Sequence, residues 1–177
     1  PQALRELVAQ AAIPQGMVDA VGAAYHAIGG KPVSVRSSST LEDRLNATFA
    51  GQHDTVLNVL DEGQLWEAIK ECWESLWSDR AIHYLRAMDM SAREMKMALV
   101  VQEMVQADAS GVAFTIHPVT GDRAQAVVYA GFGLGEGTVS GEVSPDEAVI
   151  QRDSMEITEV TLGAKATKVT AFVDPTT

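Results

Sequence analysis

The sequence predicts an α+β fold in which helices come first and a mostly antiparallel sheet follows. Apolar residues recur at helical spacing early in the chain, whereas short apolar or alternating segments between turn residues follow from Met97 onward. Helices and strands that are segregated along a chain favour this class over alternating α/β. We therefore divide the chain into a helix-rich part, residues 1–95, and a strand-rich part, residues 96–177.

Several helix ends can be recognised in the helix-rich part. A first helix is expected over residues 4–11, and Pro14 can open a second helix that Gly29-Gly30 ends. Asp61 and Gln64 have the spacing of a capping box, so a third helix begins there.

The third helix is predicted to form part of the core. Its broad apolar stripe includes three tryptophans, which we assign to the core rather than to stacking on a ligand. These are Trp66, Trp73 and Trp77. A fourth helix is expected to begin at Ser78 or Asp79.

Strands are expected where the pattern alternates or is apolar throughout. Val33 to Arg36 alternates, and Met97 to Val101 is continuously apolar, as a strand buried on both faces would be. Ser37 to Ala50 lacks a sustained period and is predicted to be a long loop, which is typical of functional segments. The other expected strands are residues 55–60, 112–116, 126–130, 147–150, 157–162 and 168–173.

Charge and cysteine content limit the classes of function. With 13 Lys and Arg against 24 Asp and Glu, the formal net charge is −11, so we expect neither nucleic acid nor a membrane as partner. Cys72 is the single cysteine, which suits a reducing compartment, and we expect a cytoplasmic location. The N-terminus has no signal-peptide layout and no initiator Met, so we expect a longer parent chain.

Motifs of the commonest enzyme classes do not occur in the sequence. There is no P-loop, and the glycines from Gly131 to Gly137 do not match the dinucleotide fingerprint. No histidine or cysteine cluster has metal-ligand spacing, so we assign no metal ligand in this chain.

The residues that follow Val35 predict an anion site. The Arg36 guanidinium offers a planar fork for phosphate oxygens, and Ser37 to Thr40 add hydroxyls and loop amides. The alternative is an arginine that pairs with Glu42 or Asp43, beside a loop that merely turns.

Gly51 provides a second signal, between this loop and the strand that begins near Thr55. A glycine there lets a flap of backbone approach a ligand closely and close over phosphates. The alternative is a simple bend into the strand.

Together these segments resemble the N-terminal nucleotide-binding domain shared by phosphoenolpyruvate synthase, pyruvate phosphate dikinase and rifampicin phosphotransferase. The run VRSSSTLEDRLNATFAGQHDTVLNV carries the resemblance without gaps. Further similar segments are residues 75–81, 101–105, 110–118, 133–136 and 141–147. The resemblance covers roughly residues 32–152 and implies an ATP-grasp-like fold that binds ATP.

The resemblance implies phosphate-binding roles for three residues. Arg36 matches the family arginine that contacts the nucleotide phosphates, and it is the candidate catalytic residue. Gly51 matches the flap glycine, and Thr55 matches the threonine that lines the nucleotide site. His53 lacks the Thr-Ser-His context of the family phosphohistidine, so we do not assign it that role.

The resemblance also implies an adenine hinge and an acidic residue. Gln102, Glu103 and Val105 match the hinge whose backbone groups read the adenine edge, and Glu136 matches an acidic residue near the ribose and phosphates. Alternatively, Gln102 and Glu103 simply end a strand at the surface, and Glu136 is a turn residue bonded to its own glycine-rich loop.

Two elements of the family pattern are not found in the sequence. One is a glycine-lysine element near the start, and the other is a strand pair whose acidic residue and glutamine hold Mg²⁺. We therefore expect the metal ligands outside this chain, and we expect the chain alone to bind ATP weakly or not at all and to be inactive.

The leading hypothesis is the ATP-binding portion of a dikinase-type phosphotransferase. As the resemblance implies, ATP would phosphorylate a histidine on another domain, and the group would pass to pyruvate or a related acceptor held by a further domain. The alternative is a non-catalytic nucleotide-binding or interaction module of the same fold. A carboxylate–amine ligase of the ATP-grasp class ranks last, because it does not share the run from Val35 to Gly51.

Overall fold

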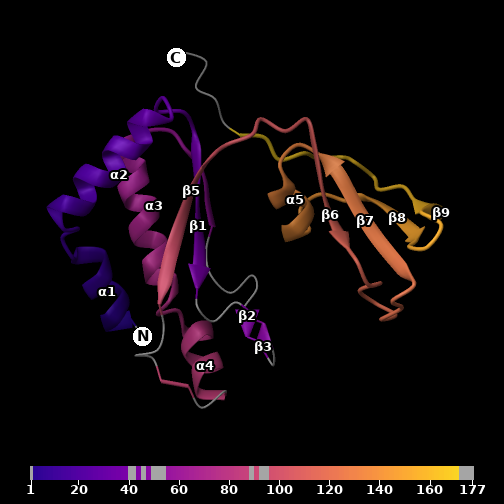
Figure 1. The fold of residues 1–177 in the computed structure, drawn as a ribbon, viewed down its shortest axis with the longest axis horizontal. Helices are drawn as coiled ribbons and strands as arrows, with labels where there is room; N and C mark the ends of the chain where they lie inside the picture. Colours follow the sequence, from indigo (N-terminus) through magenta and orange to yellow (C-terminus); the bar gives the residue numbers. More distant parts are fainter. Residues whose placement is uncertain are drawn as a thin grey trace. The chain divides into compact units, whose positions relative to one another are not determined.

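The computed structural model describes residues 2–39, 43–44, 47–48, 55–87, 90–91 and 96–171. The chain forms two compact units, Pro1–Met104 and Val105–Thr177, most of whose elements are labelled in Figure 1. Helices and mostly antiparallel sheets occur in the order expected, so the α+β prediction is confirmed. The units divide after Met104 rather than at residue 95, because the strand that begins at Met97 pairs with the first strand of the chain.

The first unit contains four helices among its described residues. They are α1 (Gln2–Gln10), α2 (Gln15–Ala27), α3 (Glu62–Ser75) and α4 (Asp79–Ala87). Two of the predicted helix ends are confirmed by their backbone geometry and hydrogen bonding. Gly29 and Gly30 adopt φ of 84° and 58° after α2, and Asp61 accepts a hydrogen bond of 2.8 Å from the Gln64 amide at the start of α3.

The sheet of the first unit has three strands in the order β4-β1-β5, all antiparallel. The strands are β1 (Val33–Ser39), β4 (Thr55–Val59) and β5 (Met97–Glu103). A separate ribbon pairs β2 (Asp43–Arg44) with β3 (Ala47–Thr48). Pairing with β5 continues along β1 to Ser39, so the prediction of a loop from Ser37 to Ala50 was wrong for its first three residues and for the four residues of β2 and β3.

The core of this unit lies between the sheet and α3, which packs on β1 and β4 (Figure 1). The largest fully buried side chains of this unit are Val33, Val35, Val59, Leu65 and Cys72. Trp66 and Trp73 are partly buried against them, as predicted, whereas Trp77 lies beyond the end of α3 and is not among the described side chains that pack on this cluster.

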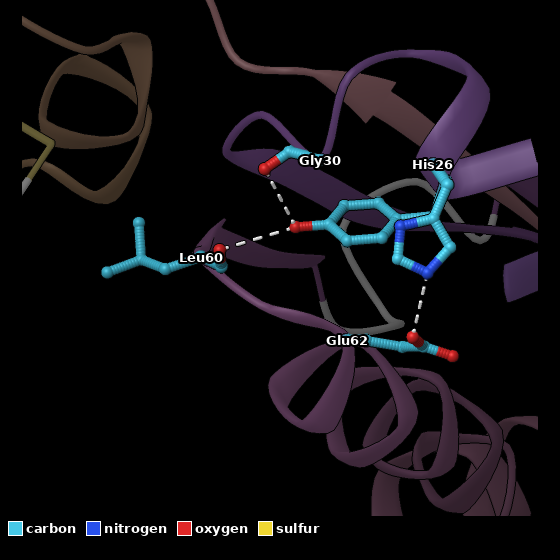
Figure 2. Close-up of polar contacts among 5 residues, drawn as sticks. His26, Gly30, Leu60 and Glu62 are labelled. Carbon is cyan, nitrogen blue, oxygen red and sulfur yellow. Dashed lines mark hydrogen bonds and ion pairs between the residues drawn. The ribbon is translucent and has the colours of Figure 1, made fainter. Parts of the chain in front are cut away.

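The buried Tyr25 ties the end of α2 to the end of β4. Its hydroxyl lies 3.2 Å from the Gly30 carbonyl and 3.3 Å from the Leu60 carbonyl, and Figure 2 shows both acceptors. Beside it, Nε2 of His26 lies 3.1 Å from Oε2 of Glu62 at the start of α3. Burial, followed by the charges of Asp61 and Glu62, raises the pKa of Tyr25 above its ordinary value, so the group stays a neutral donor.

The second unit is a four-stranded antiparallel sheet in the order β6-β7-β8-β9, with one short helix packed on β6 and β7. The elements are β6 (Ala109–Phe114), β7 (Gln125–Phe132), α5 (Gly135–Ser140), β8 (Asp146–Gln151) and β9 (Glu156–Thr161). The strand expected over residues 168–173 does not form across its described part. Val169 makes only an isolated bridge with Gly133, and residues 172 and 173 lie outside the described range.

No helix in the part of the chain that the structure describes is long and apolar enough to cross a bilayer.

Candidate functional site

The two faces of β1 differ in what covers them. Val33 and Val35 point to the helices and are fully buried, and Arg36, the next residue along, is exposed on the opposite face. Ser38 is exposed on the same face as Arg36, whereas Ser37 and Ser39 alternate to the helix side. The predicted hydroxyl cradle is therefore split between two faces, because the segment is a strand. Thr40 lies outside the described residues.

A row of three side chains crosses the exposed face. Arg36 pairs with Thr55 of β4 on one side and with Val100 of β5 on the other. Residues that pair across antiparallel strands share a face. The cation of Arg36 therefore lies between the hydroxyl of Thr55 and the apolar side chain of Val100. Gln102 pairs with Ser34 and lies on the same face, one pair further along β5. The structure thus brings together three of the predicted site residues.

The hydrogen-bond pattern brings Arg36 closer to Thr55 than to Val100. The Met104 amide donates a hydrogen bond of 2.8 Å to the Pro32 carbonyl, so Pro32 and Met104, directly before β1 and directly after β5, form a hydrogen-bonded pair. Hydrogen-bonded and non-hydrogen-bonded pairs alternate along antiparallel strands, and Arg36 with Val100 is therefore also a hydrogen-bonded pair. The backbone of Arg36 therefore points to β5, and Arg36 with Thr55 is a non-hydrogen-bonded pair. Such pairs have Cα atoms about 4.5 Å apart, against about 5.5 Å in the other kind.

The same alternation decides which backbone groups of the predicted hinge are available. Those of Gln102 point to β1, and its carbonyl also lies 3.4 Å from the Ser34 hydroxyl that donates to it. Those of Glu103 point to the other edge of β5, which is the outer strand of this three-stranded sheet. Glu103 thus offers an N–H and a C=O at the sheet edge, and Gln102 offers its side chain on the exposed face.

The carboxylate of Glu103 is already engaged, because it lies 2.6 Å from Nζ of Lys31. Both side chains are about half exposed, so this pair is a weak surface interaction. Within the described residues, Arg36 has no ion-pair partner. Glu42 and the side chain of Asp43, the partners considered in the alternative interpretation of Arg36, lie outside what the structure describes.

The remaining predicted residues are not part of this row. Gly51 lies outside the described residues. Val105 and Glu136 belong to the second unit, where Val105 is 75% exposed and Glu136 lies in the first turn of α5. Both interpretations of Glu136, as a nucleotide contact and as a turn residue, remain predictions.

The second unit contains a charge pair of its own. Nζ of Lys165 lies 2.7 Å from Oδ2 of Asp146 and 5.7 Å from the centre of the Phe132 ring. The Lys165 ammonium, and after it the Gly163 amide that donates to Oδ1 at 2.9 Å, hold the pKa of Asp146 below its ordinary value. This pair lines a small open cavity of about 170 Å³ beside Ala130.

Two larger cavities contain none of the predicted nucleotide-binding residues. One, of about 360 Å³, lies between α2 and the helix side of β5, where Leu99 and Val101 line it. The other, of about 350 Å³, lies in the second unit beside Phe114 and Tyr129. Burial, followed by a hydrogen bond with Glu147, raises the pKa of Tyr129, so this second cavity is lined by a neutral phenol, the Thr138 side chain and apolar groups.

No group of three or more His, Cys, Asp or Glu side chains in the described ranges is arranged to hold a metal ion. The described residues therefore do not fit a Mg²⁺ site, and we assign no chemical step to a metal. They do fit a phosphate group, because a cation and a hydroxyl lie side by side on an exposed sheet face.

Val100 and Ser38 share the face of Arg36 and were not predicted as site residues. Met97 to Val101 was predicted to be buried on both faces, which was wrong. Val100 is 49% exposed, and exposed and half-buried residues alternate along the strand. Counting in steps of two from Arg36 would have identified Ser38, but Val100 is identified only once the register with β1 is known.

Comparisons with known proteins identify the family of the chain. Residues 1–176 match the family model described as "Pyruvate phosphate dikinase, AMP/ATP-binding domain". The chain is similar to a phosphoenolpyruvate synthase of Aeropyrum pernix, with 45% identity over 143 residues, which are 81% of this chain and 17% of that protein. It is similar to a rifampicin phosphotransferase of Streptomyces sviceus, with 42% identity over 171 residues, which are 96% of this chain and 20% of that protein.

A third relative carries a different name. The prodigiosin synthesizing transferase PigC of Serratia marcescens is 42% identical over 160 residues, which are 90% of this chain and 18% of that protein. The chain thus spans about a fifth of the length of the curated relatives that it matches.

Proposed function

Because the chain belongs to the pyruvate phosphate dikinase AMP/ATP-binding family, we propose that the exposed face of its three-stranded sheet binds the phosphates of ATP. The observation that carries this proposal is the pairing of Arg36 with Thr55 across β1 and β4. Arg36 supplies a planar guanidinium to phosphate oxygens, and Thr55 supplies a hydroxyl from the neighbouring strand.

The adenine is proposed to lie at the outer edge of β5. The Glu103 N–H and C=O point to that edge, which provides the donor and acceptor pair that an adenine edge requires. The Gln102 side chain is on the face nearest the ribose in this arrangement. Val105, Glu136 and the Gly51 flap remain proposed contacts of the nucleotide on the basis of the family resemblance alone.

The chemistry proposed for the whole protein is phosphoryl transfer from ATP to a histidine of another domain. A ring nitrogen of the histidine would form a bond to phosphorus, and the leaving phosphate oxygen would keep the electron pair of the broken P–O bond. Arg36 would stabilise the charge that spreads over the phosphate oxygens, because such reactions depend on positioning and charge neutralisation. The phosphoryl group would then pass to pyruvate or a related acceptor held by a further domain.

Magnesium is proposed to take part through ligands other than the described residues, and when bound it would neutralise phosphate charge. We also propose an ATP-grasp-like architecture and a cytoplasmic location. The cytoplasmic location is supported by the buried Cys72, the single cysteine of the sequence, which suits a reducing compartment.

The test is labelling of the full-length protein with radioactive ATP. Formation of an acid-labile, alkali-stable phosphoprotein is expected for a phosphohistidine. ATP binding without any labelled protein would instead support the non-catalytic module of the same fold. Failure of the full-length protein to bind ATP would reject the proposal.

A further inference from the structure

We propose that Val100 is a positioning residue for the nucleoside part of the nucleotide, and that its side chain packs under the ribose between the adenine edge and the phosphates. The inference rests on the proposed function, since it names a further contact in the same site. It goes beyond that function because the family resemblance carried no role for Val100, and the sequence pattern predicted its burial inside the fold.

Val100 lies at one end of the row that crosses the sheet. It pairs with Arg36 in a hydrogen-bonded pair, and the row from Val100 through Arg36 to Thr55 covers all three strands. Neighbouring strands are about 4.8 Å apart, so this row spans roughly 10 Å. A nucleotide that lies along the row has its phosphates over β1 and β4 and its nucleoside over β5.

The chemical groups along β5 follow an order that suits a nucleoside. The edge-facing backbone groups of Glu103 lie three residues beyond Val100, and the Gln102 side chain lies two residues beyond it on the same face. The shortest path from the edge of β5 to Arg36 therefore crosses the exposed face at Val100 and Gln102. A ribose on this path meets an apolar side chain next to a hydrogen-bonding one, which suits its carbon skeleton and its hydroxyls.

The side chain of Val100 is 49% exposed. It is the apolar member of its row, whose other side chains are the cation of Arg36 and the hydroxyl of Thr55. Single exposed apolar residues are common on protein surfaces, so exposure alone does not indicate that a residue binds a ligand. In this row, however, Val100 lies on the strand next to Arg36, the residue proposed to bind phosphate. A bound nucleotide would remove the Val100 side chain from water at that place.

The experiment measures binding of ATP and AMP to the full-length protein in which Val100 is replaced. Val100→Thr keeps the β-branch and the shape but replaces a methyl group with a hydroxyl, and Val100→Ala removes the apolar contact without adding a polar group. Matched controls are Val160→Thr and Val160→Ala, because Val160 is a strand valine of the second unit that is 57% exposed.

We expect both Val100 variants to weaken ATP and AMP by the same factor, about fivefold, relative to the matched controls. The factors are equal because AMP shares the nucleoside but lacks the outer phosphates. Unchanged binding of either nucleotide in folded Val100 variants would overturn this inference and leave the proposed function standing. Wild-type protein that fails to bind ATP would overturn the proposed function and this inference with it.

Discussion

Arg36 and Thr55 lie opposite each other on β1 and β4, as a non-hydrogen-bonded pair on the exposed face of the sheet. They are 19 positions apart in the sequence, and the segment that joins them includes the predicted flap glycine. The pairing places a guanidinium and a hydroxyl within reach of one phosphate group, and the proposed nucleotide site is built on this pair.

Replacement of Thr55 by valine tests the hydroxyl of this pair. Thr55→Val keeps the β-branched shape and the strand propensity, so the sheet should be retained. Loss of one hydrogen bond to a charged phosphate, worth about 1.5 kcal/mol, should weaken ATP binding about tenfold in a calorimetric titration of the full-length protein. Thr55→Ser is the matched control and should bind ATP nearly as the wild type does. Equal affinities for the valine and serine variants would show that the hydroxyl makes no contact.

The Tyr25 hydroxyl offers a prediction about stability alone. Tyr25→Phe removes the donor to the Gly30 and Leu60 carbonyls while filling the same volume, and a buried hydrogen bond of this kind contributes about 1 kcal/mol. Amide hydrogen exchange should become faster at the end of α2 and the end of β4, with ATP affinity unchanged. Exchange that stays as slow as in the wild type would contradict the anchoring role of this hydroxyl.

The Asp146–Lys165 pair produces a pH dependence whose sign is fixed by the lowered pKa of Asp146. Because the folded pKa lies below the unfolded one, the stabilisation is present above the ordinary aspartate pKa and is lost as the pH falls through the folded value. Carboxyl-carbon NMR should show Asp146 titrating below an ordinary aspartate. Lys165→Met should raise this midpoint, and a midpoint that does not move would exclude Lys165 as the main cause.

Residues 1–177 expressed alone are expected to bind ATP weakly or not at all and to show no turnover. The described residues include no group arranged to hold Mg²⁺, and charge neutralisation by that ion is a major part of this chemistry. A calorimetric titration with ATP and MgCl₂ provides the measurement. Tight binding that depends on magnesium would contradict the expectation.

Local signals in the sequence predicted the helices of the first unit well. The capping box at Asp61 and the glycines after α2 act within a few residues of their position, so their effect is visible without knowledge of the fold. The lengths of the strands were predicted less well. Ser37 to Ser39 have turn-forming side chains, yet pairing with β5 holds them in a strand.

The candidate site shows the same division. Arg36 and Thr55 could be selected as candidates from residue type and family resemblance, but their position in one row depends on the register between strands. Val100 was missed because the apolar run from Met97 to Val101 shows no alternation that would distinguish its two faces. Which face of the strand is covered depends on elements distant in sequence. The backbone groups of Glu103 became the better hinge candidates only when the pairing of β5 was known.

Binding of the ATP phosphates by Arg36 on the exposed sheet face is the contact on which the proposed function depends most. Its decisive test is calorimetric titration of ATP into full-length Arg36→Gln protein, beside the wild type and Arg36→Lys. Loss of charge-assisted hydrogen bonds should weaken ATP binding roughly tenfold to hundredfold in Arg36→Gln, while Arg36→Lys should fall between because it keeps the charge without the planar fork. A folded Arg36→Gln protein that binds ATP as tightly as the wild type would show that Arg36 does not bind the phosphates.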